Sequence, residues 1–143
     1  MADRYAIVVA RFYDELAARL EAGARAVFES EGATVEVFDV PGTFELPAAA
    51  AYVAATGRFK GVACLGAVIR GETDHYVHVC AAAARGIQDV SLESGVPCSF
   101  GVLTVDTLEQ AFARSGGDKR DSGADAARAV LALAGIRRRL RLS

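Results

Sequence analysis

The sequence predicts an α/β fold, a three-layer α/β/α sandwich with a four-stranded parallel sheet between two layers of helices. Four short apolar runs alternate along the chain with longer segments whose apolar residues recur at helical spacing. This alternation is typical of βαβ units with right-handed crossovers. The apolar runs are nearly continuous, which indicates strands covered on both faces. The 143 residues contain no internal repeat, low-complexity tract or long linker, so we expect a single domain over residues 1–143.

The expected strands are the four runs rich in apolar residues, of which the second alternates partially between apolar and polar residues. They cover Tyr5–Val9, Thr34–Val40, Gly61–Ile69 and Cys98–Leu103. The expected helices are five segments with helical spacing or high alanine content, some of them ending before a glycine. They cover Asp14–Ser30, Phe44–Thr56, Thr73–Ser94, Leu108–Arg114 and Ala124–Leu140.

The composition points away from nucleic acid and towards contact with other protein subunits. The chain is 52% hydrophobic, which is high for a small monomer with little interior, so part of this surface is expected to face other subunits. The alternative is that the abundant alanine inflates this fraction. The net charge of −2 gives no sign of a nucleic-acid partner. The basic run Arg137–Arg141 is interpreted as a solvated helix end, where cations suit the helix dipole.

The cysteines indicate a reducing compartment and no metal site. Cys64, Cys80 and Cys98 are odd in number, match no metal-binding spacing and lie in apolar contexts. We expect three reduced, buried thiols of a cytoplasmic protein. The apolar run Tyr5–Ala10 is too short for the core of a signal peptide or for a membrane span, so no membrane partner is expected.

Ligands of open parallel sheets bind at the carboxyl ends of the strands, and the polar, aromatic and glycine residues of this chain gather there. After the third expected strand, Gly71 permits close backbone approach or an unusual φ, and Thr73 or Asp74 can cap the next helix. A helix N-terminus there would bind an anion. His75 would then lie at the mouth of that site, where it could move protons near neutral pH, unless it is a surface histidine without a role.

The second strand end offers a carboxylate and an aromatic ring. Glu45 falls in the expected first turn of the next helix, where it could complement the helix dipole or accept hydrogen bonds from polyol hydroxyls. Phe44 is adjacent, and Phe12 follows the first strand. The pattern alone favours ordinary core packing for both phenylalanines.

These motifs, in this order, resemble those of the lumazine synthase family over nearly the whole chain. The matching segments are Ala10–Phe12, Asp39–Pro47, Gly66–Thr73, His75–Tyr76, Phe100–Thr104 and Thr107–Ala111, followed by Arg114. The resemblance implies a flavodoxin-like fold and a transferase of riboflavin biosynthesis. That enzyme condenses 5-amino-6-ribitylamino-uracil with 3,4-dihydroxy-2-butanone 4-phosphate to 6,7-dimethyl-8-ribityllumazine and needs no cofactor or metal.

The resemblance also assigns roles to residues. It implies catalysis by His75 and contacts with the uracil and ribityl groups from Phe12, Thr43, Phe44, Glu45, Ala67, Val68, Ile69 and Phe100. It implies phosphate binding by Gly71, Glu72, Thr73 and Arg114. In the family, Phe100 and Arg114 come from the neighbouring subunit of a homopentamer, so active sites lie at subunit interfaces. Five subunits, ten, and a shell of sixty all remain open.

The chain departs from the family at the phosphate site. Ser122 stands where the family has a lysine that helps to hold the phosphate substrate, and Lys119 or Arg120 could substitute for it. Tyr13 stands where a small polar residue is common. These departures leave a second hypothesis, a pentameric assembly module with weakened or absent catalysis, either a divergent paralogue or an engineered cage component that docks a designed second component.

Two further hypotheses concern the same fold. An archaeal-type riboflavin synthase is disfavoured by the Phe44-Glu45 and His75-Tyr76 motifs. A flavodoxin-like nucleotide binder is disfavoured because Arg11-Phe12-Tyr13 stands where a glycine-rich phosphate loop would follow the first strand.

Overall fold

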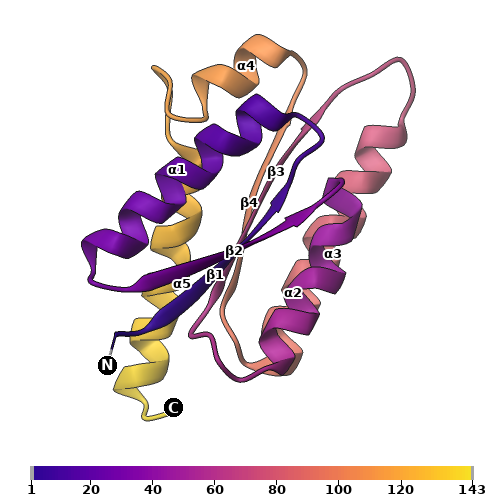
Figure 1. Ribbon diagram of the computed structural model, residues 1–143. Helices are drawn as coiled ribbons and strands as arrows, with labels where there is room; N and C mark the ends of the chain where they lie inside the picture. The colour runs from indigo at the N-terminus through magenta and orange to yellow at the C-terminus, as the bar shows by residue number, and fades with distance from the viewer. Residues whose placement is uncertain (1, 143) are drawn as a thin grey trace.

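The computed structural model describes residues 2–142 and has a four-stranded parallel sheet between two layers of helices, so the predicted fold class is confirmed (Figure 1). The strand order is β2-β1-β3-β4. The strands are β1 (Arg4–Ala10), β2 (Thr34–Val40), β3 (Val62–Ile69) and β4 (Cys98–Val105). The helices are α1 (Asp14–Ser30), a short 3-10 helix (Thr43–Glu45), α2 (Leu46–Ala55), α3 (His75–Ser94), α4 (Leu108–Ala113) and α5 (Ser122–Arg139).

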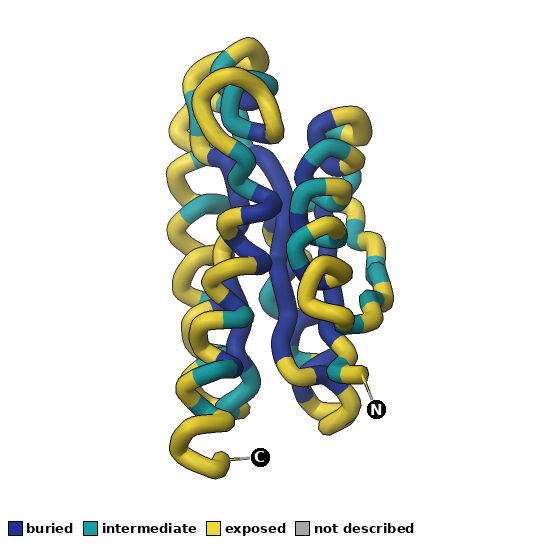
Figure 2. The backbone as a smooth tube through the Cα atoms, turned by 90° about the vertical axis from the view of Figure 1, so that its left-hand side faces the viewer, coloured by how far each residue is buried: buried dark blue, intermediate teal, exposed yellow. Residues whose placement is uncertain are grey.

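Strand β1 lies inside the sheet and is buried on both of its faces. Tyr5, Ile7 and Val9 pack into a core with α1 and α5, whereas Ala6 and Val8 pack into a second core with α2 and α3. Because successive side chains of a strand point to opposite faces, both sets must be apolar. Figure 2 shows the result, a buried sheet with exposed residues on the outer sides of the helices. This is the physical reason for the continuous apolar runs in the sequence.

The element boundaries agree with the prediction in part. The second strand and the first helix have the expected bounds. Strand β4 is longer than expected and continues to Val105, because β3 pairs with it as far as Ile69 with Val105. Thr104, expected just after this strand, therefore lies within it.

Helices α2, α3 and α5 start at residues other than those predicted. The expected helix Phe44–Thr56 is a 3-10 turn followed by α2, with Pro47 in the first turn of α2, where its missing N–H costs nothing. Helix α5 begins at Ser122 rather than Ala124, because the Asp121 side chain accepts a hydrogen bond from the Ala124 backbone N–H at 3.0 Å.

The three cysteines are free thiols, as predicted. Cys64 and Cys98 are buried, but Cys80 is only half-buried, so the prediction of three buried thiols is wrong for Cys80. Burial raises the pKa of Cys64 well above its ordinary value and raises that of Cys98 to about 12.

The basic run lies at the end of α5, with Arg137 to Arg139 in the last helical turn, as predicted. Arg138 Nη2 also donates a hydrogen bond to Asp3 Oδ2 at 2.8 Å. None of the helices among the described residues combines the length and apolarity that crossing a membrane requires. Within residues 2–142, no three or more His, Cys, Asp or Glu side chains are grouped as ligands for a metal ion.

Candidate active site

A crevice opens where the direction of the chain through the sheet reverses, between β1 and β3. The chain goes from β1 to β2 on one side and continues through β3 to β4 on the other. Ladder pairing between β1 and β3 ends at Val9 with Leu65, whereas β3 pairs with β4 as far as Ile69. The backbone of the last residues of β3, from Ala67 to Ile69, therefore does not pair with β1 and borders this crevice on that side. Ligands of open α/β sheets bind at such a reversal point.

A cleft of about 330 Å³ lies at this position, and we call it the switch-point cleft. It gathers residues that follow three strands far apart in the sequence, as the strand-end argument predicted. Its lining residues are Phe12, Tyr13, Gly42, Thr43, Phe44, Glu45, Ala67, Val68, Ile69, Gly71, Thr73, His75, Tyr76 and Val79.

Phe12 and Phe44 are exposed, so the core packing that the pattern alone favoured is wrong. Their exposed fractions are 76% and 64%. Phe12 follows the carboxyl end of β1, and Phe44 lies in the 3-10 helix that follows β2. Aromatic rings left exposed around a cleft indicate a binding surface for an apolar or planar group.

Thr43 and Glu45 form the polar side of the cleft. Thr43 is buried, and the exposed Glu45 is fixed by a hydrogen bond that its Oε1 accepts from the Gly42 backbone N–H at 2.9 Å. A carboxylate has room for about four hydrogen bonds, so Glu45 keeps acceptor sites free for hydroxyl groups.

The segment before α3 and the first residue of that helix bring Gly71, Thr73 and His75 to the same cleft. Thr73 Oγ1 accepts a hydrogen bond from the His75 backbone N–H at 3.3 Å. Asp74 occupies the N-cap position but its side chain makes no capping bond, so of the two expected caps only Thr73 bonds the helix start. Gly71 has no positive φ and nothing within 4 Å of an added Cβ, so neither the unusual φ nor the close backbone approach offered by the sequence is found within this chain. Glu72 is exposed and lies outside the lining.

Four lining residues were given no role in the sequence analysis: Tyr13, Gly42, Tyr76 and Val79. Tyr13 follows Phe12 directly, Tyr76 follows His75, and Val79 lies one helical turn after His75. Tyr76 also lies under the Arg70 guanidinium, 5.5 Å from ring centre to Cζ. Helical spacing could have identified Val79, because residues four apart share a helix face.

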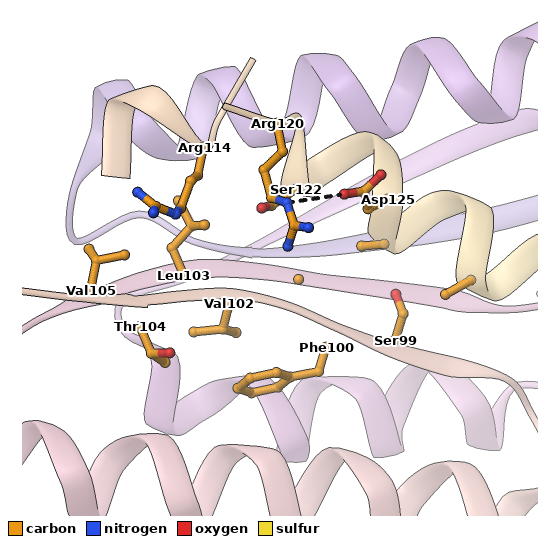
Figure 3. Close-up of a pocket in the computed structure, with 13 residues that line it drawn as sticks. Ser99, Phe100, Val102, Leu103, Thr104, Val105, Arg114, Arg120, Ser122 and Asp125 are labelled. Carbon is orange, nitrogen blue, oxygen red and sulfur yellow. Dashed lines mark ion pairs between the residues drawn. The ribbon is translucent and has the colours of Figure 1, made fainter. Parts of the chain in front are cut away.

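A second cleft, of about 340 Å³, runs along β4, and we call it the β4 cleft. It is lined by Ser99–Val105 together with Arg114, Arg120, Ser122, Asp125, Ala126 and Ala129. In Figure 3, Phe100 and Thr104 lie on one side of β4, and Arg114 and Arg120 lie on the other. Within one chain, neither Phe100 nor Arg114 lines the switch-point cleft that holds His75.

The two arginines of the β4 cleft make few and weak contacts with other groups of the chain. Arg114 Nη1 donates to the Gln110 carbonyl oxygen at 3.1 Å, and Arg120 Nε lies 4.0 Å from Asp125 Oδ2 on the surface. Ser122 stands beside them at the start of α5. Lys119 does not line this cleft, so of the two candidate substitutes for the missing lysine only Arg120 is placed in it.

Arg11 fixes the backbone at the edge of the switch-point cleft. Its Nε donates to Asp39 Oδ1 at 2.8 Å, its Nη2 donates to Glu21, and its backbone N–H donates to the Val40 carbonyl oxygen at 2.9 Å. Burial lowers the pKa of Arg11, but the hydrogen bonds to these two carboxylates more than offset this and raise it above its ordinary value. The ends of β1 and β2 are therefore joined by charged groups.

Comparison with known proteins identifies the family. A family model described as 6,7-dimethyl-8-ribityllumazine synthase matches residues 2–138. The chain is similar to proteins of that name from Syntrophus aciditrophicus (43% identity over 140 residues, 96% of this chain and 91% of the relative) and Desulfatibacillum aliphaticivorans (43% over 136 residues, 93% and 88%). It is equally similar to the one from Salinibacter ruber (43% over 134 residues, 92% and 86%). With the fold, the cleft and these similarities together, the chain belongs to the 6,7-dimethyl-8-ribityllumazine synthase family.

Proposed function

We propose that this protein is a transferase that condenses 5-amino-6-ribitylamino-uracil with 3,4-dihydroxy-2-butanone 4-phosphate to 6,7-dimethyl-8-ribityllumazine, in the cytoplasm. The observation that carries the proposal is the switch-point cleft, in which exposed rings, an anionic acceptor and a histidine converge in a chain of this family. The amine forms an imine with the ketone and releases water, phosphate is eliminated, and the ribityl-bearing nitrogen closes the ring on the remaining carbonyl with loss of a second water. Holding two small molecules in the correct geometry supplies most of the catalysis.

The amine substrate fits the part of the cleft between β1, β2 and β3. Phe12 would stack on the uracil ring, and the open backbone edge of Ala67, Val68 and Ile69 would bond the pyrimidine. The ribityl chain would extend along Thr43, Phe44 and Glu45, with Glu45 accepting from its hydroxyls. Each of these groups presents the chemistry that the corresponding part of the substrate needs.

The phosphate substrate fits the start of α3. Gly71 and Thr73 precede a helix of 20 residues, whose positive dipole end favours an anion. His75, in the first turn of α3, would transfer protons during imine formation and loss of phosphate. Glu72 was assigned to phosphate binding by family resemblance, and as an exposed anion outside the lining it would contribute through its backbone.

A complete site needs Phe100 and Arg114, which line the β4 cleft of the same chain and not the switch-point cleft. We propose that the β4 cleft of one subunit covers the switch-point cleft of its neighbour in a homopentamer. Exposed apolar side chains on α3 and β4, among them Val77 and Phe100, support burial of this surface. The active site would then be closed by the neighbour's aromatic ring and guanidinium.

Arg120 would supply the cation that the family's lysine provides elsewhere. Its side chain lines the same cleft as Arg114 and Ser122, and its contact with Asp125 is long and exposed. A guanidinium binds phosphate oxygens in pairs, so the substitution keeps the charge. Ser122 therefore gives no support to an assembly module without catalysis.

The condensation assay tests the proposal. Purified protein and the two substrates should form the lumazine, followed by its absorbance, faster than the substrates do without protein. A rate equal to the spontaneous background would overturn the proposed function.

A further inference from the structure

Phe12 meets the ring of Tyr13 edge-on at the rim of the switch-point cleft. The ring centres lie 4.9 Å apart and the planes make an angle of 83°. An edge-to-face pair of this kind is favourable beyond its buried area, because the positive edge of one ring meets the negative face of the other. Among the described residues, Tyr13 is the aromatic ring in contact with the exposed Phe12.

Tyr13 can hold Phe12 because Tyr13 is itself anchored. It is half-buried and packs against the apolar core between the sheet and helices α1 and α5. On the other side of Phe12, Arg11 is bonded to Asp39 and Glu21. Phe12 thus lies between two residues of the sequence that are held in place by other parts of the chain.

Tyr13 does not stabilise the start of helix α1 by capping. Tyr13 occupies the N-cap position of α1, and its side chain makes no capping hydrogen bond. In α4 and α5 the N-cap side chains of Thr107 and Asp121 do accept such bonds, from Gln110 and Ala124. An asparagine or serine at an N-cap stabilises a helix, so the ring at position 13 forgoes a local gain.

We propose that Tyr13 is a positioning residue. Its ring holds the Phe12 ring in one orientation at the cleft, so that Phe12 is already oriented to stack on the planar ring of the amine substrate. This inference rests on the proposed function, since it deepens the role of Phe12. A preoriented ring loses less rotational freedom when the ligand binds. The contribution should therefore appear in the binding of the amine and not in that of the phosphate substrate.

Three variants distinguish the effect of the Tyr13 ring from the effects of its hydroxyl group and of an N-cap at this position. Tyr13→Phe keeps the ring, Tyr13→Leu keeps apolar packing without the ring edge, and Tyr13→Asn removes the ring while restoring a cap. We expect Tyr13→Phe to retain the wild-type KM for the amine, and Tyr13→Leu and Tyr13→Asn to raise it about two- to tenfold. The KM for the phosphate substrate should stay unchanged in all three, and the melting temperature of Tyr13→Asn should not fall below that of Tyr13→Leu.

A double-mutant cycle provides the decisive measurement. In a Phe12→Ala background, Tyr13→Leu should raise the KM for the amine no further, because the ring that it orients is gone. An equal rise in both backgrounds, or a wild-type KM in Tyr13→Leu and Tyr13→Asn, overturns this inference while the proposed function stands. A wild-type protein that forms no lumazine overturns both.

Discussion

Arg114 and Arg120 both present a guanidinium group to the β4 cleft, which Ser122 also lines. Because a charge-assisted hydrogen bond contributes about 1.5–3 kcal/mol, losing one corresponds to roughly ten- to a hundredfold in binding. Arg120→Ala should therefore raise the KM for the phosphate substrate by that factor and leave the KM for the amine unchanged. Steady-state kinetics with each substrate varied in turn measures both.

Lys119→Ala is the matched control for Arg120→Ala, since Lys119 is adjacent but does not line the cleft. It should behave as wild type. Ser122→Lys added to Arg120→Ala should restore part of the lost affinity. A larger effect of Lys119→Ala than of Arg120→Ala would contradict the assignment.

His75 and His78 lie one turn apart on α3, but only His75 lines the switch-point cleft. If His75 transfers protons, His75→Ala should lower kcat by about a hundredfold and change either KM far less. His78→Ala should retain wild-type kcat. A rise in KM with kcat unchanged would show that His75 binds substrate instead.

At the scale of elements, α1 and α5 approach closely at Gly123. A Cβ added there would lie 2.1 Å from the Leu20 carbonyl oxygen, so the two helices would have to separate. Gly123→Ala should lower the free energy of unfolding by about 3 kcal/mol. Gly135 lies on the same helix with no atom within 4 Å of an added Cβ, and Gly135→Ala should raise it by about 0.5–1 kcal/mol. Urea unfolding compares the two, and equal effects would contradict the close approach.

The core between β3, β4, α2 and α3 contains the thiol of Cys98, whose pKa is raised by burial from its ordinary value of 9.0 to about 12. The folded state thus favours the neutral thiol. Its contribution to stability is complete below pH 9 and is lost as the pH rises from about 9 towards 12. The urea midpoint should fall over this range, and Cys98→Ala should reduce the fall. A variant with the wild-type slope would exclude Cys98 as a cause.

How far the sequence predicts each element depends on what its residues encode. The pattern of apolar residues is sufficient to predict the bounds of the helix Asp14–Ser30 and of the strand Thr34–Val40, and both are confirmed. The break between Glu45 and Leu46 comes with Pro47 in the first turn of α2, and the extra length of β4 comes from its pairing with β3. The pattern of a single strand or helix does not contain this information. The exposure of Phe12 depends on where β1 ends relative to the helices, so only family resemblance indicated its role.

At the scale of the whole molecule, the proposed site is divided between subunits, and mixing tests this. His75→Ala damages the switch-point cleft, and Arg114→Ala damages the β4 cleft. Each variant alone should have little activity, but an equal mixture, unfolded and reassembled together, should regain about a quarter of the wild-type rate, because that share of interfaces joins two intact halves.

Native mass measurement of the wild type checks the assembly itself, with five subunits or a multiple of five as the expected result. A mixture that stays as inactive as its components would contradict the divided site, as would an active monomer.

The proposed division of the site between subunits also has a consequence for mixtures of intact and damaged chains. A subunit with both clefts damaged would spoil the site on each of its two flanks, so activity in a mixed population would fall with the square of the intact fraction. A cell with equal amounts of intact and doubly damaged protein would then keep roughly a quarter of its activity instead of half. The damaged copy would thus lower the activity of the intact copy as well as losing its own.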